Sequence, residues 1–106
     1  GNLHGMLRAG LNPRLDIERV GELRAAAGVP LVLHGGSGIA DEDIAAAVRA
    51  GIALVHVNTE LRLAYRKALM RSLEESPDEI APYKYLRPAS QALESVVAEK
   101  LRLFGW

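Results

Sequence analysis

A histidine and a glycine-rich turn directly follow a short apolar run. The run covers residues 29–33 and reads VPLVL, and residues 34–38 read HGGSG. Neutral imidazole is a common zinc ligand and also serves as a general base. Glycines let backbone N–H groups approach a ligand closely, and a helix that begins after such a turn adds its positive end. These residue types predict a site for an anion together with a metal ion or a general base.

A second apolar run also ends in polar residues. Residues 52–58 read IALVHVN, and Thr59 follows them. The carboxyl ends of parallel strands lie at one edge of a sheet, and in (βα)8 barrels the loops after the last two strands commonly hold phosphate. We therefore expect the two polar strand ends to form a phosphate site. The alternative, that Gly35, Gly36 and Gly38 only make a tight turn, stays open.

The histidines are the candidate metal ligands, and each has a simpler alternative. His4 and His34 are the candidates for zinc, but His4 is also compatible with an exposed loop and His34 with a hydrogen-bonded core position. His56 alternates with Val55 and Val57, so it shares a strand face with Leu54. It is compatible with a hydrogen-bonded residue that lines a barrel, and we do not expect it to complete a zinc site.

The chain order predicts an α/β fold. Apolar periodicity and capping residues predict helices over about 16–28, 41–51, 59–75 and 88–104, with strands at 30–33 and 52–58 and an irregular stretch at 83–87. Two apolar strands joined by a helix make a right-handed β-α-β unit with a parallel pair. Such a pair needs further strands and cover on both faces, so we expect part of a larger parallel sheet or barrel. Asp41 and Asp43 are interpreted as first-turn helix residues rather than catalytic acids.

Composition excludes several classes of function. Thirteen basic and 13 acidic side chains cancel, so nothing favours nucleic acid or an anionic membrane as a partner. The absence of cysteine excludes a disulfide framework and a thiolate metal site, and it fits a cytoplasmic location. No apolar run is long enough to span a bilayer, and no signal peptide is visible. The first residues, GNLHG without an initiator methionine, indicate part of a longer protein.

Several motifs together resemble the class II, zinc-dependent ketose-bisphosphate aldolases, which include fructose- and tagatose-bisphosphate aldolases. They are GNLHG at 1–5, PLVLHGGSG at 30–38, VNTELR at 57–62, YLRPA at 85–89 and VAEKLRLFG at 97–105. The resemblance covers essentially the whole chain. It implies the C-terminal part of a (βα)8 barrel, from the end of the sixth strand through strands seven and eight to the closing helices. Residues 1–106 would then form a single partial domain.

The resemblance also implies roles for individual residues. His4 and His34 match two zinc-binding histidines, while the third zinc histidine and the catalytic aspartate would lie in a missing N-terminal half. The positions that match the triose-phosphate site are Gly5, Gly35, Gly36, Ser37, His56, Val57, Asn58 and Thr59. A monovalent cation near the phosphate and a dimer or larger homo-oligomer are further expectations of the resemblance.

The chain departs from the family pattern at three positions. Leu54 and His56 stand where the family usually has a lysine and an asparagine, and the asparagine normally contacts the substrate. His56 could donate a similar hydrogen bond. Ala40 replaces the usual helix-capping residue, so we expect Asp41 to be the N-cap.

The expected reaction is the reversible aldol cleavage of a ketose bisphosphate, as in glycolysis. Zinc would polarise the ketone of dihydroxyacetone phosphate and stabilise the enediolate, and a carboxylate would move the proton. This chain alone is predicted to be inactive, with the rows of Leu31, Leu33, Val55 and Val57 left uncovered. The rival hypothesis is a non-catalytic phosphate-binding or structural fragment.

Overall fold

The computed structural model describes residues 14–105, which divide into two units. The strand unit contains the described residues up to Asn58 together with residues 103–105, and the helical unit covers Thr59–Arg102. The fold is of the α/β class, as the sequence predicts. In the described part of the chain, no helix is long and apolar enough to cross a membrane.

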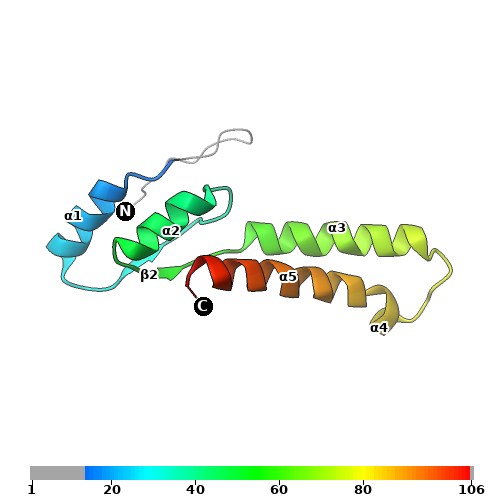
Figure 1. Cartoon of the computed structure of the whole chain (residues 1–106). Helices are drawn as coiled ribbons and strands as arrows, with labels where there is room; N and C mark the ends of the chain where they lie inside the picture. Colours follow the sequence, from blue (N-terminus) through cyan, green and yellow to red (C-terminus); the bar gives the residue numbers. More distant parts are fainter. Residues whose placement is uncertain (1–13, 106) are drawn as a thin grey trace. The chain divides into compact units, whose positions relative to one another are not determined.

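The strand unit is a β-α-β unit preceded by a helix (Figure 1). Its elements in chain order are α1 (Ile17–Ala27), β1 (Leu31–Leu33), α2 (Asp41–Arg49) and β2 (Ile52–Val55). Helix α1 begins where the Asp16 side chain accepts a hydrogen bond from the Arg19 N–H, and it ends at Gly28 in the left-handed conformation. Helix α2 likewise ends before Gly51, whose φ is 113°. These boundaries follow the predicted capping residues.

β1 and β2 form a two-stranded parallel sheet with helices packed on one face. The paired residues are Leu31 with Ile52, Val32 with Leu54, and Leu33 with Val55. Leu33 is buried, whereas Val32 and Leu54 are 43% and 52% exposed. The core on the helix side consists of Leu15, Val20, Leu33, Ile39, Ile44, Ala47 and Ile52.

The predicted row of uncovered residues is therefore wrong for Leu33, which is buried, and for Leu31 and Val55, which are partly buried and pack against the core. The register shifts by one residue between the pair Leu31–Ile52 and the pair Val32–Leu54, so strict alternation does not hold along β2. Past that point, Leu33 and Val55 lie on the side of the core, while Val32 and Leu54 are exposed on the other side. The exposed apolar row is the pair Val32 and Leu54. The sequence pattern could not distinguish the two faces, because both carry apolar residues.

The helical unit is an antiparallel helix pair with a short helix in the connection (Figure 1). Its elements are α3 (Thr59–Glu75), α4 (Pro82–Tyr85) and α5 (Arg87–Leu103), of which the last residue belongs to the strand unit. Lys100 near the end of α5 forms an ion pair of 2.9 Å with Glu60 in the first turn of α3. Ala89 and Ser72 are buried where the two helices lie close to the connection.

Two local predictions are wrong. The stretch 83–87 is not irregular: Pro82 begins α4 at a position where its missing N–H costs nothing, and α5 starts at Arg87. The N-cap of α2 is Ala40, with φ −59° and ψ 138°, and not Asp41. Asp41 has already entered the helix, and the Ala40 carbonyl accepts the first helical hydrogen bonds.

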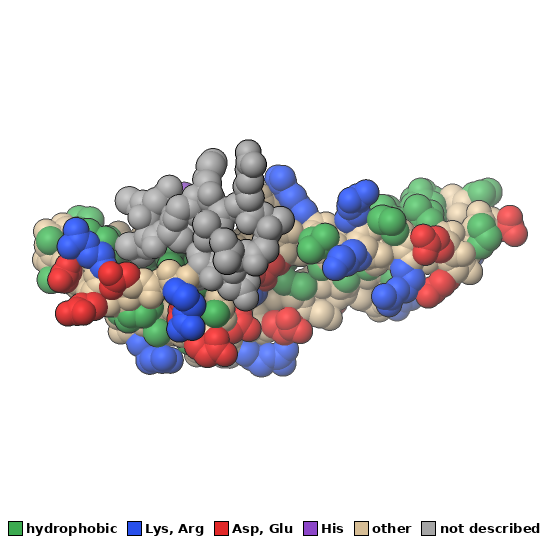
Figure 2. Space-filling view, turned by 90° about the horizontal axis from the view of Figure 1, so that it is seen from above, with side chains coloured by type: hydrophobic (Ala, Val, Ile, Leu, Met, Phe, Trp, Pro, Cys, Tyr) green, Lys and Arg blue, Asp and Glu red, His purple; other side chains and the backbone are tan. Residues whose placement is uncertain are grey.

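The surface carries charges of both signs. On the face shown in Figure 2, the basic and acidic side chains of the described residues are interspersed with hydrophobic ones. This mixture agrees with the balanced composition of 13 basic and 13 acidic side chains.

Candidate functional site

His34 and His56 each directly follow a strand, and backbone hydrogen bonds hold the two strand ends together. The His56 N–H donates to the Leu33 carbonyl at 2.9 Å, and the Gly36 N–H donates to the His56 carbonyl at 3.2 Å. The pairing of Leu33 with Val55 makes the next residues, the two histidines, neighbours on the opposite face. They therefore share the face on which Val32 is exposed.

The two imidazole rings meet edge to face. Nδ1 of His34 lies 3.0 Å from Nδ1 of His56, the ring centroids are 4.4 Å apart and the interplanar angle is 88°. In the neutral pair, one Nδ1 donates the hydrogen bond and the other accepts it. Both side chains are exposed.

The glycine turn beside these histidines needs glycine for two different reasons. Gly35 and Gly38 have φ values of 69° and 83°, which L side chains rarely adopt. Gly36 is needed for space, because a Cβ there would lie 3.0 Å from Val55 Cγ1 and 3.3 Å from the His56 carbonyl oxygen. The Gly36 N–H, which is a predicted phosphate contact, already donates to His56, so Gly36 positions the turn against β2.

The remaining predicted site residues are partly accessible. Ser37 and Val57 are half-buried, and Asn58 and Thr59 are exposed. Thr59 is the first residue of α3, as predicted. His4 and Gly5 lie outside the described residues, so the predicted convergence of His4 with His34 stays a prediction.

Within residues 14–105, no group of three or more histidine, cysteine, aspartate or glutamate side chains could hold a metal ion. The described part therefore contributes two neighbouring imidazoles at most. Their contact was missed at the sequence level, although a signal for it was present. Each histidine follows its apolar run immediately. When two parallel strands pair so that the last residues of the two runs lie opposite each other, the residues that follow them lie side by side.

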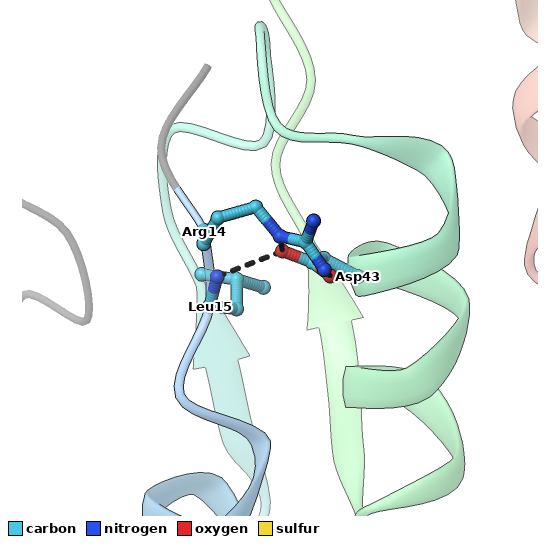
Figure 3. Close-up of polar contacts among 3 residues, drawn as sticks. All are labelled: Arg14, Leu15 and Asp43. Atoms are coloured by element: carbon cyan, nitrogen blue, oxygen red, sulfur yellow. Dashed lines mark hydrogen bonds and ion pairs between the residues drawn. The ribbon is translucent and has the colours of Figure 1, made fainter. Parts of the chain in front are cut away.

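Asp43 is a structural carboxylate, as its place in the first turn of α2 predicts (Figure 3). Its Oδ2 accepts hydrogen bonds from the Leu15 N–H and from Arg14 Nε, both at 2.9 Å, and its Oδ1 accepts one from Arg14 Nη2 at 3.0 Å. The backbone hydrogen bond from Leu15 and the Arg14 guanidinium lower the pKa of the carboxyl below its usual range. Asp43 thereby ties the segment before α1 to α2.

The comparisons with known proteins agree with one another. A family model described as "Fructose-bisphosphate aldolase class-II" matches residues 1–106. The chain is 40% identical over 105 residues to a protein named probable fructose-bisphosphate aldolase from Bacillus subtilis, and 41% identical over 105 residues to a fructose-bisphosphate aldolase from Staphylococcus epidermidis. Each match covers 99% of this chain and 36% of the relative.

A solved structure is similar as well. The crystal structure of the YdjI aldolase from Escherichia coli K12 matches 88% of this chain and 34% of its own, with a TM-score of 0.70 and 40% sequence identity. The chain thus spans about a third of the length of the proteins that it matches.

Proposed function

Because the chain belongs to the class II fructose-bisphosphate aldolase family, we propose that it supplies part of a metal-dependent ketose-bisphosphate aldolase. The reaction is the reversible cleavage of a carbon–carbon bond in a phosphosugar to give dihydroxyacetone phosphate and an aldehyde. The observation that carries the proposal is the position of His34, at the end of β1 and directly before the glycine turn. That arrangement supports the proposal because an imidazole suited to a metal ion lies beside a glycine turn suited to a phosphate.

The residues present fit a zinc ion. Imidazole nitrogen is a common zinc ligand, and the accessible Nδ1 of His34 has another imidazole nitrogen within 3.0 Å. His34 would hold the ion together with His4, which matches the family's motif but lies outside the described residues. When bound, zinc supplies Lewis-acid polarisation of the substrate's carbonyl oxygen.

The chain's own residues would bind and orient the phosphate end of the substrate. The left-handed conformations of Gly35 and Gly38 shape a turn, and Gly36 holds that turn against β2. Ser37 is half-buried in this turn and offers a hydroxyl. Fixing the phosphate in this way orients the reacting carbons, which contributes to the rate through positioning. The other proposed contacts come from Gly5, Val57, Asn58 and Thr59, with a monovalent cation near the phosphate. The resemblance also implies a substrate contact for His56, whose ring lies against His34 in this structure.

The larger architecture belongs to the same proposal. The exposed Val32 and Leu54 show a sheet face that apolar neighbours would cover in a (βα)8 barrel. We propose that residues 1–106 are one partial domain, the C-terminal part of such a barrel, in a cytoplasmic homo-oligomer. The match to the YdjI aldolase over 34% of that chain supports this assignment.

A non-catalytic fragment is the second candidate function. The observation in its favour is that residues 14–105 offer no group of three metal-binding side chains. The resemblance implies that the proton-transfer aspartate lies outside residues 1–106, and a positioned proton-transfer group typically contributes about 10²–10⁴-fold to the rate. This chain alone is therefore predicted to be inactive.

The test compares two proteins, the 106-residue chain and the same chain joined to the N-terminal part of the Bacillus subtilis relative. Cleavage of fructose and tagatose bisphosphates is measured with a coupled triose-phosphate assay, with and without zinc. We expect zinc-dependent turnover only in the joined protein, lost in His34→Ala and kept in the exposed control Arg66→Gln. A joined protein that folds but does not cleave either substrate would contradict the proposal.

A further inference from the structure

We propose that His56 binds the same divalent metal ion as His34, with both residues using Nδ1. This inference rests on the proposed metal-dependent function and adds a ligand that the resemblance does not supply. With His4 and the third histidine that the resemblance implies, the ion would have four protein ligands, and the substrate's carbonyl oxygen would enter as a fifth. His56 stands where the family usually has an asparagine that contacts substrate, so the sequence alone favours a substrate contact. The geometry of the two rings points to the metal instead.

The distance between the two nitrogens fits two ligands of one ion. In a tetrahedral site with zinc–nitrogen bonds of about 2.0–2.1 Å, two ligand nitrogens lie about 3.3 Å apart. Nδ1 of His34 and Nδ1 of His56 are 3.0 Å apart in this structure. A small rotation of either ring would open the pair to the ligand distance. The two ring planes are nearly perpendicular, at 88°.

The backbone holds His56 in this position. Its N–H donates to the Leu33 carbonyl, and its carbonyl accepts from the Gly36 N–H. Both partners flank His34 in sequence, so the segment that carries one imidazole fixes the segment that carries the other. Ligands held on paired strand ends are preorganised for a metal ion.

The hydrogen bond between the two rings brings the Nδ1 atom of His56 to the candidate ligand atom of His34. If His34 binds the ion through Nδ1, the hydrogen bond between the rings is lost, and the His56 lone pair lies close to the ion. Both side chains are exposed, which leaves a path for the ion to enter.

The test follows the imidazole nitrogens directly. The ¹⁵N-labelled 106-residue chain is titrated with zinc, and the ring nitrogens are observed by two-dimensional NMR, with dispersed amide signals as the check of folding. We expect Nδ1 of both His34 and His56 to shift together at one equivalent of zinc. In competition with a chelator, His56→Asn should weaken zinc binding about tenfold or more. The control Arg66→Gln should leave zinc binding unchanged.

The same titration is made on the chain joined to the N-terminal part of the Bacillus subtilis relative, which would complete the sheet. The His56→Asn variant of the joined protein identifies the His56 signals. A shift of Nδ1 of His34 without one of His56, or equal zinc affinity in His56→Asn, would overturn the inference and leave the proposed function intact. A shift of His56 only on addition of dihydroxyacetone phosphate would assign it to the substrate and also overturn the inference. Loss of cleavage in the joined protein is a separate result and bears on the proposed function.

Discussion

Gly36 shows how one residue links the fold to the candidate site. A Cβ on it would contact β2 more tightly than most Cβ atoms contact their neighbours, and its N–H donates to the carbonyl of the residue whose imidazole meets His34. A glycine in such a turn is easily interpreted as a phosphate contact, because small residues and accessible amides usually occur together. In this chain the requirement is space between two strand ends. The glycine pattern predicts the turn, but only the sheet pairing shows which amide the protein already uses.

Gly36→Ala is expected to destabilise the chain and separate the two imidazoles. The new Cβ would lie 3.0 Å from Val55 Cγ1 and 3.3 Å from a backbone oxygen that cannot move without shifting His56. Overpacking of this kind costs about 1–3 kcal/mol of unfolding free energy, which urea denaturation would measure. Gly21→Ala is the matched control. Position 21 lies within α1 with no atom within 4 Å of a new Cβ, so this variant should gain about 0.5–1 kcal/mol. Equal stability of the two variants would contradict the close approach.

Asp43 is expected to make stability depend on acid pH. Its hydrogen bonds from Leu15 and Arg14 lower the carboxyl pKa in the folded state. A lowered folded-state pKa contributes stability that is present above the unfolded pKa of about 3.9 and is lost as the pH falls through the folded value. The difference in unfolding free energy between the parent chain and Asp43→Asn should therefore be larger at pH 7 than at pH 3. The pKa of Glu79 is also lowered, by Lys84 and the Ala81 N–H. Glu79→Gln should therefore remove a separate part of the pH-dependent unfolding free energy. A pH-independent difference for Asp43→Asn would contradict this account.

At the scale of elements, local sequence signals located the helices wherever the capping residue and the apolar periodicity agreed. Asp16 and Gly28 bound α1, and the break at Ser76 ends α3, as predicted. The short helix α4 was missed, because contacts of Glu79 with the Ala81 N–H and with Lys84 support it, and neither leaves a periodic pattern. The meeting of His34 with His56 was missed for a related reason, since it depends on strand register and not on either strand alone.

The ion pair between Lys100 and Glu60 is expected to stabilise the helix pair. The two side chains are 14% and 29% exposed, so they are less accessible to solvent than a typical surface pair. Lys100→Met should lower the unfolding free energy by about 1 kcal/mol, the upper end for exposed pairs. Lys67→Met, on the exposed surface of α3, is the control and should change it by less than about 0.5 kcal/mol. A double-mutant cycle with Glu60→Gln that shows no coupling would exclude the proposed role of the pair.

At the scale of the whole molecule, the two-stranded sheet presents an apolar face that needs a partner. Val32 and Leu54 are paired across the strands and exposed, whereas Leu33 on the other face is 3% exposed. A parallel pair with one uncovered apolar face and unpaired strand edges is a site for self-association. The sequence predicted an uncovered face from the apolar runs but assigned Leu33 to it, because only the packing of α1 and α2 determines which face is covered.

We expect the isolated 106-residue chain to self-associate through this face, and Leu54→Lys to reduce the association. Leu54 is 52% exposed beside Val32, so a lysine there adds charge to the apolar row without opening the core. Sedimentation velocity over a range of concentrations would measure the effect. The control is Ile80→Lys, which changes a more exposed apolar residue, at 89%, in the loop before α4 and should leave the association unchanged. If Ile80→Lys reduced association as strongly as Leu54→Lys, general surface hydrophobicity would be the cause. Covering this face is what the remaining strands of a barrel would do, so the chain joined to the N-terminal part of the relative should be insensitive to concentration in the same experiment.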